Sequence, residues 1–278
     1  MNWTCPNCGA ALDTHFCPSC GERSLDEREL TVRGLADQIF EALTSVDGRL
    51  LRSFVGLVRR PGDLTVAYLK GQRRPYLGPV PLFFMANVLF FAVESFLHGG
   101  VLAATLAAHM SAQPWDEWAQ RVVAERVAAL GTTVEAYTPA FDVALALHAR
   151  SLIILMALSF ALLPWLAFYR RHKPFVAHAV FSLHLYAFLL LMLCVADVEP
   201  ALAARLGGPT LLWWLVDKGL AIALLIACGA YLYVATKKVY AADGAARVVK
   251  VLVLTVGVGA CVLGYRFALF VLTLYTTP

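Results

Sequence analysis

Two matched cysteine pairs stand near the start of the chain, Cys5-Pro-Asn-Cys8-Gly and Cys17-Pro-Ser-Cys20-Gly. In each pair two thiolates can converge on one ion, and the glycine that follows permits a tight turn. Together the pairs complete the closed, four-thiolate shell of structural zinc, which leaves no position for water. The sequence therefore predicts one structural zinc ion per chain, bound by Cys5, Cys8, Cys17 and Cys20 in a ribbon over residues 1–24.

Two other interpretations of the cysteine pairs stay open. Two disulfides would suit an exported domain, but no export signal precedes the ribbon, because the first long apolar run begins near residue 80. A redox Cys-x-x-Cys motif is less typical of two matched pairs. The remaining cysteines (Cys194, Cys228 and Cys261) each stand alone in an apolar run, where a thiol behaves as a small hydrophobe.

The composition is that of a membrane protein. Hydrophobic residues make up 60% of the 278 residues, charged residues only 15%, and the mean hydropathy is +0.68. Five segments are long and apolar enough to cross about 30 Å of hydrocarbon as helices. We expect an all-α bundle over residues 80–278, with spans at 80–97, 151–169, 176–196, 211–235 and 248–275 and an external loop at 98–148.

The basic residues between these spans are distributed unequally. The connections on one side hold twelve lysines and arginines, and those on the other side hold four. The positive-inside rule then predicts a cytoplasmic N-terminus and an external C-terminus. A reducing cytoplasm also suits the thiolates of the ribbon. The same asymmetry accounts for the small net charge of +4, so we expect no nucleic-acid partner.

A cytoplasmic linker at residues 25–79 joins the ribbon to the first span. Apolar residues recur at helical spacing from Thr31, and again from Leu50 to Val58, where arginines flank a broad apolar face that Pro61-Gly62-Asp63 ends. Such a helix can lie in the headgroup plane of the membrane, or it can pack on other helices. Both interpretations stay open.

Cations and a tyrosine then stand where the chain enters the membrane. Lys70, Arg73, Arg74 and Tyr76 are candidates for contact with a lipid phosphate. An ordinary positive-inside anchor with an aromatic belt explains the same residues.

These features resemble one family of proteins. The paired Cys-x-x-Cys-Gly motifs, Arg59-Arg60-Pro61-Gly62, the stretch from Tyr68 to Tyr76, and Phe175-Val176-Ala177-His178 to Phe188 are similar to a bacterial family. Its members are zinc-ribbon-headed, multi-pass membrane proteins that carry a domain of unknown function. The resemblance covers residues 5–97 and 148–193. It implies location in the bacterial inner membrane and brings no established activity.

Ionisable residues inside the predicted spans are the sharpest functional signal. Charged side chains are costly in lipid and usually face a bundle interior or a cavity. At 1.5 Å per residue, four charges fall in one layer on the outer side of the midplane, with Asn87 on the same helix face as one of them. The layer consists of Asn87, Glu94, Asp217, Lys218 and Arg266. It either lines a polar cavity or holds the helices in register, with Glu94 paired to Arg266 or Lys218.

No catalytic residues are assigned. His178 and His184 are six positions apart on one predicted helix, about 120° around it, so they do not suit one metal ion and are expected in a polar core. In the external loop, Trp115 to Leu130 has the spacing of an amphipathic helix.

The sequence thus favours a non-enzymatic inner-membrane adaptor, sensor or assembly factor whose zinc ribbon binds a cytoplasmic protein partner and whose bundle contacts membrane lipids. A small transporter or lipid-handling protein that uses the outer charged layer is the alternative, and a membrane-embedded enzyme is the third.

Overall fold

The computed structural model describes residues 3–4, 9–14, 17–19, 48–71, 75–97, 104–198 and 211–278, with only the backbone for 211–218. The chain separates into two compact units, Met1–Leu51 and Arg52–Pro278, which are described separately below.

The described part of the first unit contains a small hairpin. Strand β1 (Trp3–Thr4) pairs antiparallel with β2 (Ala11–Leu12), and Trp3 lies opposite Leu12. The connection between the strands therefore contains the first cysteine pair. Gly9, which follows that pair, has a φ of 74°, a left-handed conformation that glycine adopts without steric cost.

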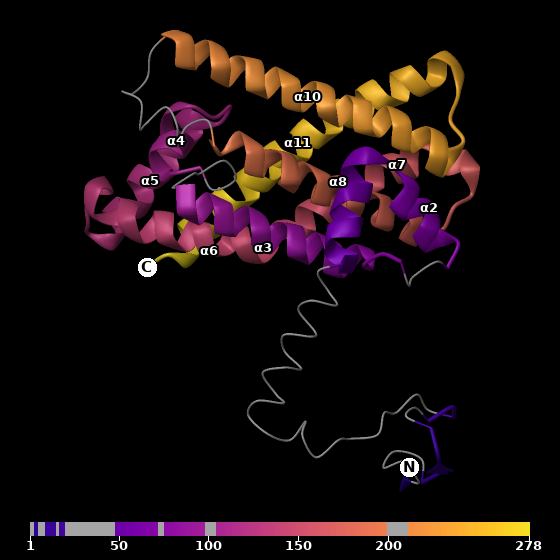
Figure 1. Ribbon diagram of the computed structural model, residues 1–278. Coiled ribbons are helices and arrows are strands. Elements are labelled where there is room, and N and C mark those ends of the chain that lie inside the picture. Colours follow the sequence, from indigo (N-terminus) through magenta and orange to yellow (C-terminus); the bar gives the residue numbers. More distant parts are fainter. Residues whose placement is uncertain are drawn as a thin grey trace. The chain divides into compact units, whose positions relative to one another are not determined.

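The second unit is a bundle of membrane-spanning helices (Figure 1). Five helices among the described residues are long and apolar enough to cross a membrane, so the protein is a multi-pass membrane protein, as its composition predicts. These helices are α3 (Pro79–Leu97), α6 (Val134–Phe160) continued by α7 (Leu162–Ala167), α8 (Phe175–Ala196), α10 (Leu211–Tyr240) and α11 (Gly244–Thr276).

Helix α8 is the centre of the bundle. Its side chains from Ala177 to Phe188 are buried on nearly every face. Helix α3 packs along α8, while α6 and α10 each pack along α11. A helix that is buried all round is expected at the core of a bundle, and the run from Val180 to Phe188 is such a stretch.

Helices α3 and α8 begin one residue before their expected bounds, and the other three spanning helices differ by more. The segment expected at 151–169 begins at Val134, because the Thr133 hydroxyl accepts a hydrogen bond from the Ala136 amide and starts a helix that continues into the apolar run. Its first turns then pack through Tyr137, Phe141 and Leu145, which are buried. Helices α10 and α11 also extend beyond 211–235 and 248–275.

Much of the expected external loop is helical. Helix α4 (Leu106–Ser111) and α5 (Asp116–Leu130) lie between α3 and α6, and α5 occupies the stretch whose spacing predicts an amphipathic helix. Together they form what we call the outer cap. It lies at the end of the bundle where α11 finishes, since Arg126 Nη2 donates to the Thr277 carbonyl over 3.0 Å.

Residues 48–59 form the second predicted linker helix, which ends before Pro61 as expected. A further helix, α2 (Asp63–Leu69), follows directly and was not expected. Helix α2 packs against α8 and α10 at the end of the bundle opposite the outer cap (Figure 1), which we call the α2 end.

Candidate functional site

Of the four predicted zinc ligands, only Cys17 belongs to the described residues. Its side chain is buried within its unit. Cys5, Cys8 and Cys20 lie outside the residues that the structure describes. Within the described ranges, no three histidine, cysteine or acidic side chains are grouped as a metal site. The left-handed Gly9 and the hairpin around the first pair suit a cysteine knuckle, and the zinc ion itself remains a prediction.

The α2 end contains the clearest polar site. Thr65 Oγ1 of α2 lies 2.8 Å from Nδ1 of His184 on α8, and both side chains are buried. Asp63 forms an ion pair of 2.6 Å with Lys238 of α10. Helix α2 is therefore joined to α8 by a hydrogen bond and to α10 by an ion pair. These contacts stabilise a helix of only seven residues.

Gly62 lets α2 approach α10 closely. Its φ is 86°, and a β-carbon placed on it would lie 2.9 Å from the Ala235 α-carbon. Any larger residue would therefore separate α2 from α10 or force a left-handed conformation on a side chain.

The second predicted core histidine, His178, lies in the first turn of α8. His178 Nδ1 is 3.0 Å from the Tyr240 hydroxyl, and the two rings are stacked with centroids 5.3 Å apart. Tyr240 is also stacked on Phe168, at 4.3 Å. His178 and His184 thus bond to different helices, as the 120° between them predicts, and they do not converge on one ion.

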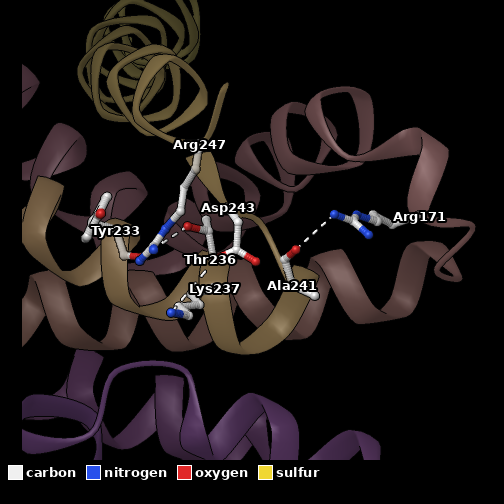
Figure 2. A network of polar contacts seen from close by, with 7 residues as sticks. All are labelled: Arg171, Tyr233, Thr236, Lys237, Ala241, Asp243 and Arg247. Atoms are coloured by element: carbon white, nitrogen blue, oxygen red, sulfur yellow. Dashed lines mark hydrogen bonds and ion pairs between the residues drawn. The ribbon is translucent and has the colours of Figure 1, made fainter. Parts of the chain in front are cut away.

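A network of basic side chains holds the turn between α10 and α11 (Figure 2). Arg247 donates from both Nε and Nη2 to the Tyr233 carbonyl, and its guanidinium lies 3.6 Å above the Tyr233 ring. Arg171 donates to the Ala241 carbonyl over 2.9 Å. Both arginines donate charge-assisted hydrogen bonds to backbone carbonyl groups, so they stabilise the turn. In the sequence these two arginines are recognisable only as basic residues that indicate the membrane topology.

The structure describes the side chains of three of the five residues in the predicted polar layer. On α3, Asn87 and Glu94 are both buried, on the face that also buries Phe83 and Phe90. Arg266 of α11 is half-buried and lies close enough to His109 of the outer cap to affect its charge. For Asp217 and Lys218 the structure describes the backbone of α10 alone, so the pairing within the layer stays a prediction.

His109 is a buried polar residue of the outer cap that is absent from the sequence-predicted site residues. Its ring is buried against Phe270 at 4.8 Å, and its Nδ1 accepts a hydrogen bond from Trp115 Nε1 over 3.3 Å. Burial, together with the positive charge of Arg266, lowers the pKa of His109 to about 4. The only indication in the sequence is that His109 lies a few residues before two tryptophans, Trp115 and Trp118.

An apolar crevice opens between α8, α10 and α11. Its volume is about 210 Å³, and nearly all of its lining is hydrocarbon. The lining includes Tyr186, Leu190, Leu193, Leu224, Cys228 and Val258. Cavities of this character stay dry, so the crevice is suited to hydrocarbon rather than to an ion or water.

The candidate lipid-phosphate residues are only partly described. Lys70 is exposed and Tyr76 is half-buried, whereas Arg73 and Arg74 lie outside the described ranges. Tyr76 is part of the short segment that packs beside residues 48–59, because its ring would lie 3.8 Å from a β-carbon on Gly56.

Comparison with known proteins finds a family that matches part of the chain. A family described as "Protein of unknown function (DUF3667)" matches residues 47–91. The matched stretch contains the helix at 48–59, α2 and most of α3, which confirms for this part the predicted resemblance to a domain of unknown function. It bears neither on a zinc ribbon nor on a bacterial source. No match was found among curated proteins or solved structures.

Proposed function

We propose that this protein is a membrane adaptor, sensor or assembly factor of the bacterial inner membrane. Its first unit, with zinc bound by Cys5, Cys8, Cys17 and Cys20, would contact a cytoplasmic protein. The observation that carries the proposal is the separation of Met1–Leu51 from the spanning bundle as a compact unit of its own. A small unit needs a metal or a partner for stability, because about fifty residues bury little apolar surface.

A zinc-dependence experiment tests this proposal. The full chain and a Cys5→Ser/Cys8→Ser variant would be crosslinked in cells, purified, and analysed for zinc and for crosslinked soluble proteins. We expect one zinc ion per wild-type chain and a reproducible soluble partner, with both lost in the variant because two of four ligands are missing. Cys194→Ser is the matched control, since its thiol lies in α8 and should affect neither readout.

Three results would contradict the proposal. One is a wild-type chain without zinc, and another is a disulfide between the two pairs in protein from a reducing cytoplasm. The third is an unchanged partner in the zinc-free variant, because the ribbon would then not be the surface that recognises it.

A lipid-handling protein is the second candidate, and the apolar crevice favours it. A dry crevice in the middle of the spanning helices fits a hydrocarbon chain, and the polar layer would supply charges on its outer side. This candidate retains the expected use of Glu94, Asp217, Lys218 and Arg266 as a functional layer rather than as pairs that hold the helices in register.

Neutralising the layer distinguishes the two roles. If Glu94 and Arg266 belong to a register-holding set, Glu94→Gln or Arg266→Gln alone should destabilise the bundle by about 3–5 kcal/mol, and the double variant should recover stability. If the layer handles lipid, wild-type protein in vesicles should move a fluorescent phospholipid between leaflets, and the double variant should fold but lose this activity. Wild-type protein without lipid movement would rule out the second candidate.

A further inference from the structure

We propose that the helix at residues 48–59 is an anionic-lipid binding element that lies in the membrane interface. This inference goes beyond the adaptor proposal, since it assigns a partner to residues 52–59 of the bundle unit and does not depend on the zinc ribbon. Two interpretations of this helix were open from the sequence, packing on the bundle or lying in the headgroup plane. In the structure both interpretations apply, because one face of the helix packs on the bundle and the opposite face is exposed.

The inner face packs on the bundle unit. Ser53 and Leu57 are fully buried, and a β-carbon on Gly56 would lie 2.7 Å from the Leu64 side chain of α2. Such close packing fixes the helix against α2, which is itself joined to α8 and α10.

Contacts with the segment before α3 fix the level of the helix. The Leu77 amide donates to Ser53 Oγ over 2.9 Å, and Arg52 Nη1 reaches the Pro75 carbonyl at 3.5 Å. Leu77 lies two residues before α3 begins at Pro79, so the helix lies where the first span enters the membrane. In Figure 1 the violet coil that precedes α2 runs across the direction of the spanning helices rather than along it. This is the orientation of a helix parallel to the membrane plane.

The outer face combines apolar and basic side chains. Val55 is 40% exposed and Val58 is 45% exposed, and at 100° per residue they lie about 60° apart on the helix. Arg59 and Arg52 are exposed and border this apolar stripe on one side. An apolar stripe with arginines along its edge fits a helix whose stripe enters the acyl region while its cations remain among the headgroups.

The charge of this surface selects the lipid. Residues 48–71 contain five basic residues and one acid, Asp63. That acid is already paired with Lys238, so it does not neutralise the arginines of the outer face. A basic surface at the level of the headgroups attracts anionic lipid, and each lysine or arginine near the surface strengthens binding about fivefold. The family match covers this whole helix, so the element belongs to the matched segment.

Photolabelling of the full-length protein tests the proposal. Wild-type protein would be reconstituted in phosphatidylcholine vesicles that contain a trace of phosphatidylglycerol with a diazirine in its acyl chain. A phosphatidylcholine probe with the same chains is the comparison. We expect labelling of the peptide that contains Val55 and Val58, with the phosphatidylglycerol probe strongly preferred at low salt.

Variants connect the preference to the arginines. Arg52→Gln and Arg59→Gln should each reduce the apparent affinity for the phosphatidylglycerol probe about fivefold. In the double variant, the ratio of phosphatidylglycerol labelling to phosphatidylcholine labelling should approach one. Arg121→Gln on α5 is the matched control, because Arg121 is exposed at the opposite end of the bundle and should leave labelling unchanged. Labelling of Phe84 and Val88, two exposed residues of α3, verifies that each variant is folded and inserted.

Two results would overturn the proposal. Absence of label at Val55 and Val58 while Phe84 and Val88 are labelled would show that water, another protein or a second copy of the chain covers the stripe. Equal labelling by the two probes would show that the arginines do not select anionic lipid.

Discussion

Single residues at the two ends of the bundle have opposite electrostatic surroundings. At the α2 end, cations meet carbonyl groups and an acid, as in Arg247 with Tyr233 and Lys238 with Asp63. At the outer cap, His109 is buried among aromatic rings and beside the cation Arg266. The first arrangement stabilises charge, whereas the second disfavours it.

The pKa of His109 predicts acid sensitivity of the outer cap. The folded-state pKa of about 4 lies below the unfolded value of about 6.5, so the unfolded chain binds more protons between these values. Stability of the cap should therefore be complete above about pH 6.5 and decline toward pH 4, by roughly 2–3 kcal/mol. Protonation also removes the acceptor for Trp115 Nε1.

Fluorescence of the tryptophans during chemical unfolding measures this effect across the pH range. His109→Gln should flatten the dependence. His172→Asn is the control, since His172 is exposed beside α8 and should leave the dependence intact. A wild-type cap equally stable at pH 4 and pH 7 would show that His109 does not titrate as its surroundings require.

At the scale of elements, α2 connects the N-terminal part of the chain to the core. It follows Pro61 and Gly62, which end the preceding helix, and it packs on both α8 and α10. Such a short helix is not stable by itself, so the packing of Leu64 and the bonds of Asp63 and Thr65 must stabilise it.

Substitution of Gly62 tests this docking. Gly62→Ala should destabilise the bundle unit by roughly 2–4 kcal/mol, because the new methyl group meets Ala235 and the residue keeps a left-handed conformation. Gly71→Ala is a matched control. Its φ is 80°, but a β-carbon there meets nothing within 4 Å, so it should cost only the backbone strain. Equal losses of thermal stability in the two variants would show that contact with Ala235 contributes nothing.

At the scale of the whole molecule, the five candidate spans among the described residues predict that the two ends of the bundle unit lie on opposite sides of the membrane. Helix α3 begins at the α2 end, and α11 finishes at the outer cap, where Arg126 and Tyr137 bond the last carbonyls. The distribution of basic residues predicts the side of the membrane on which each end lies.

Reporter fusions test this topology. A reporter at Met1 should give a cytoplasmic signal, and one after Pro278 should give an external signal, because five of the described helices are long and apolar enough to cross the membrane. A third fusion in the turn at Gly131, between α5 and α6, should agree with the C-terminal one. Signals from the same side at Met1 and Pro278 would mean that one of the five helices does not cross.

The sequence by itself determined the class of protein, and it predicted the five helices of the described residues that are long and apolar enough to cross a membrane. Long apolar runs such as Phe175–Ala196 must be helical in lipid, because no water is present to bond an open backbone. Local chemistry was equally readable at Pro61-Gly62, which ends one helix. Only the tertiary structure decided which polar side chains meet, because residues such as Thr65 and His184 are 119 positions apart and no local pattern links them. The same holds for His109 and Phe270, and for the two faces of residues 48–59. Burial of each depends on which helices pack against it, and packing is a property of the assembled bundle.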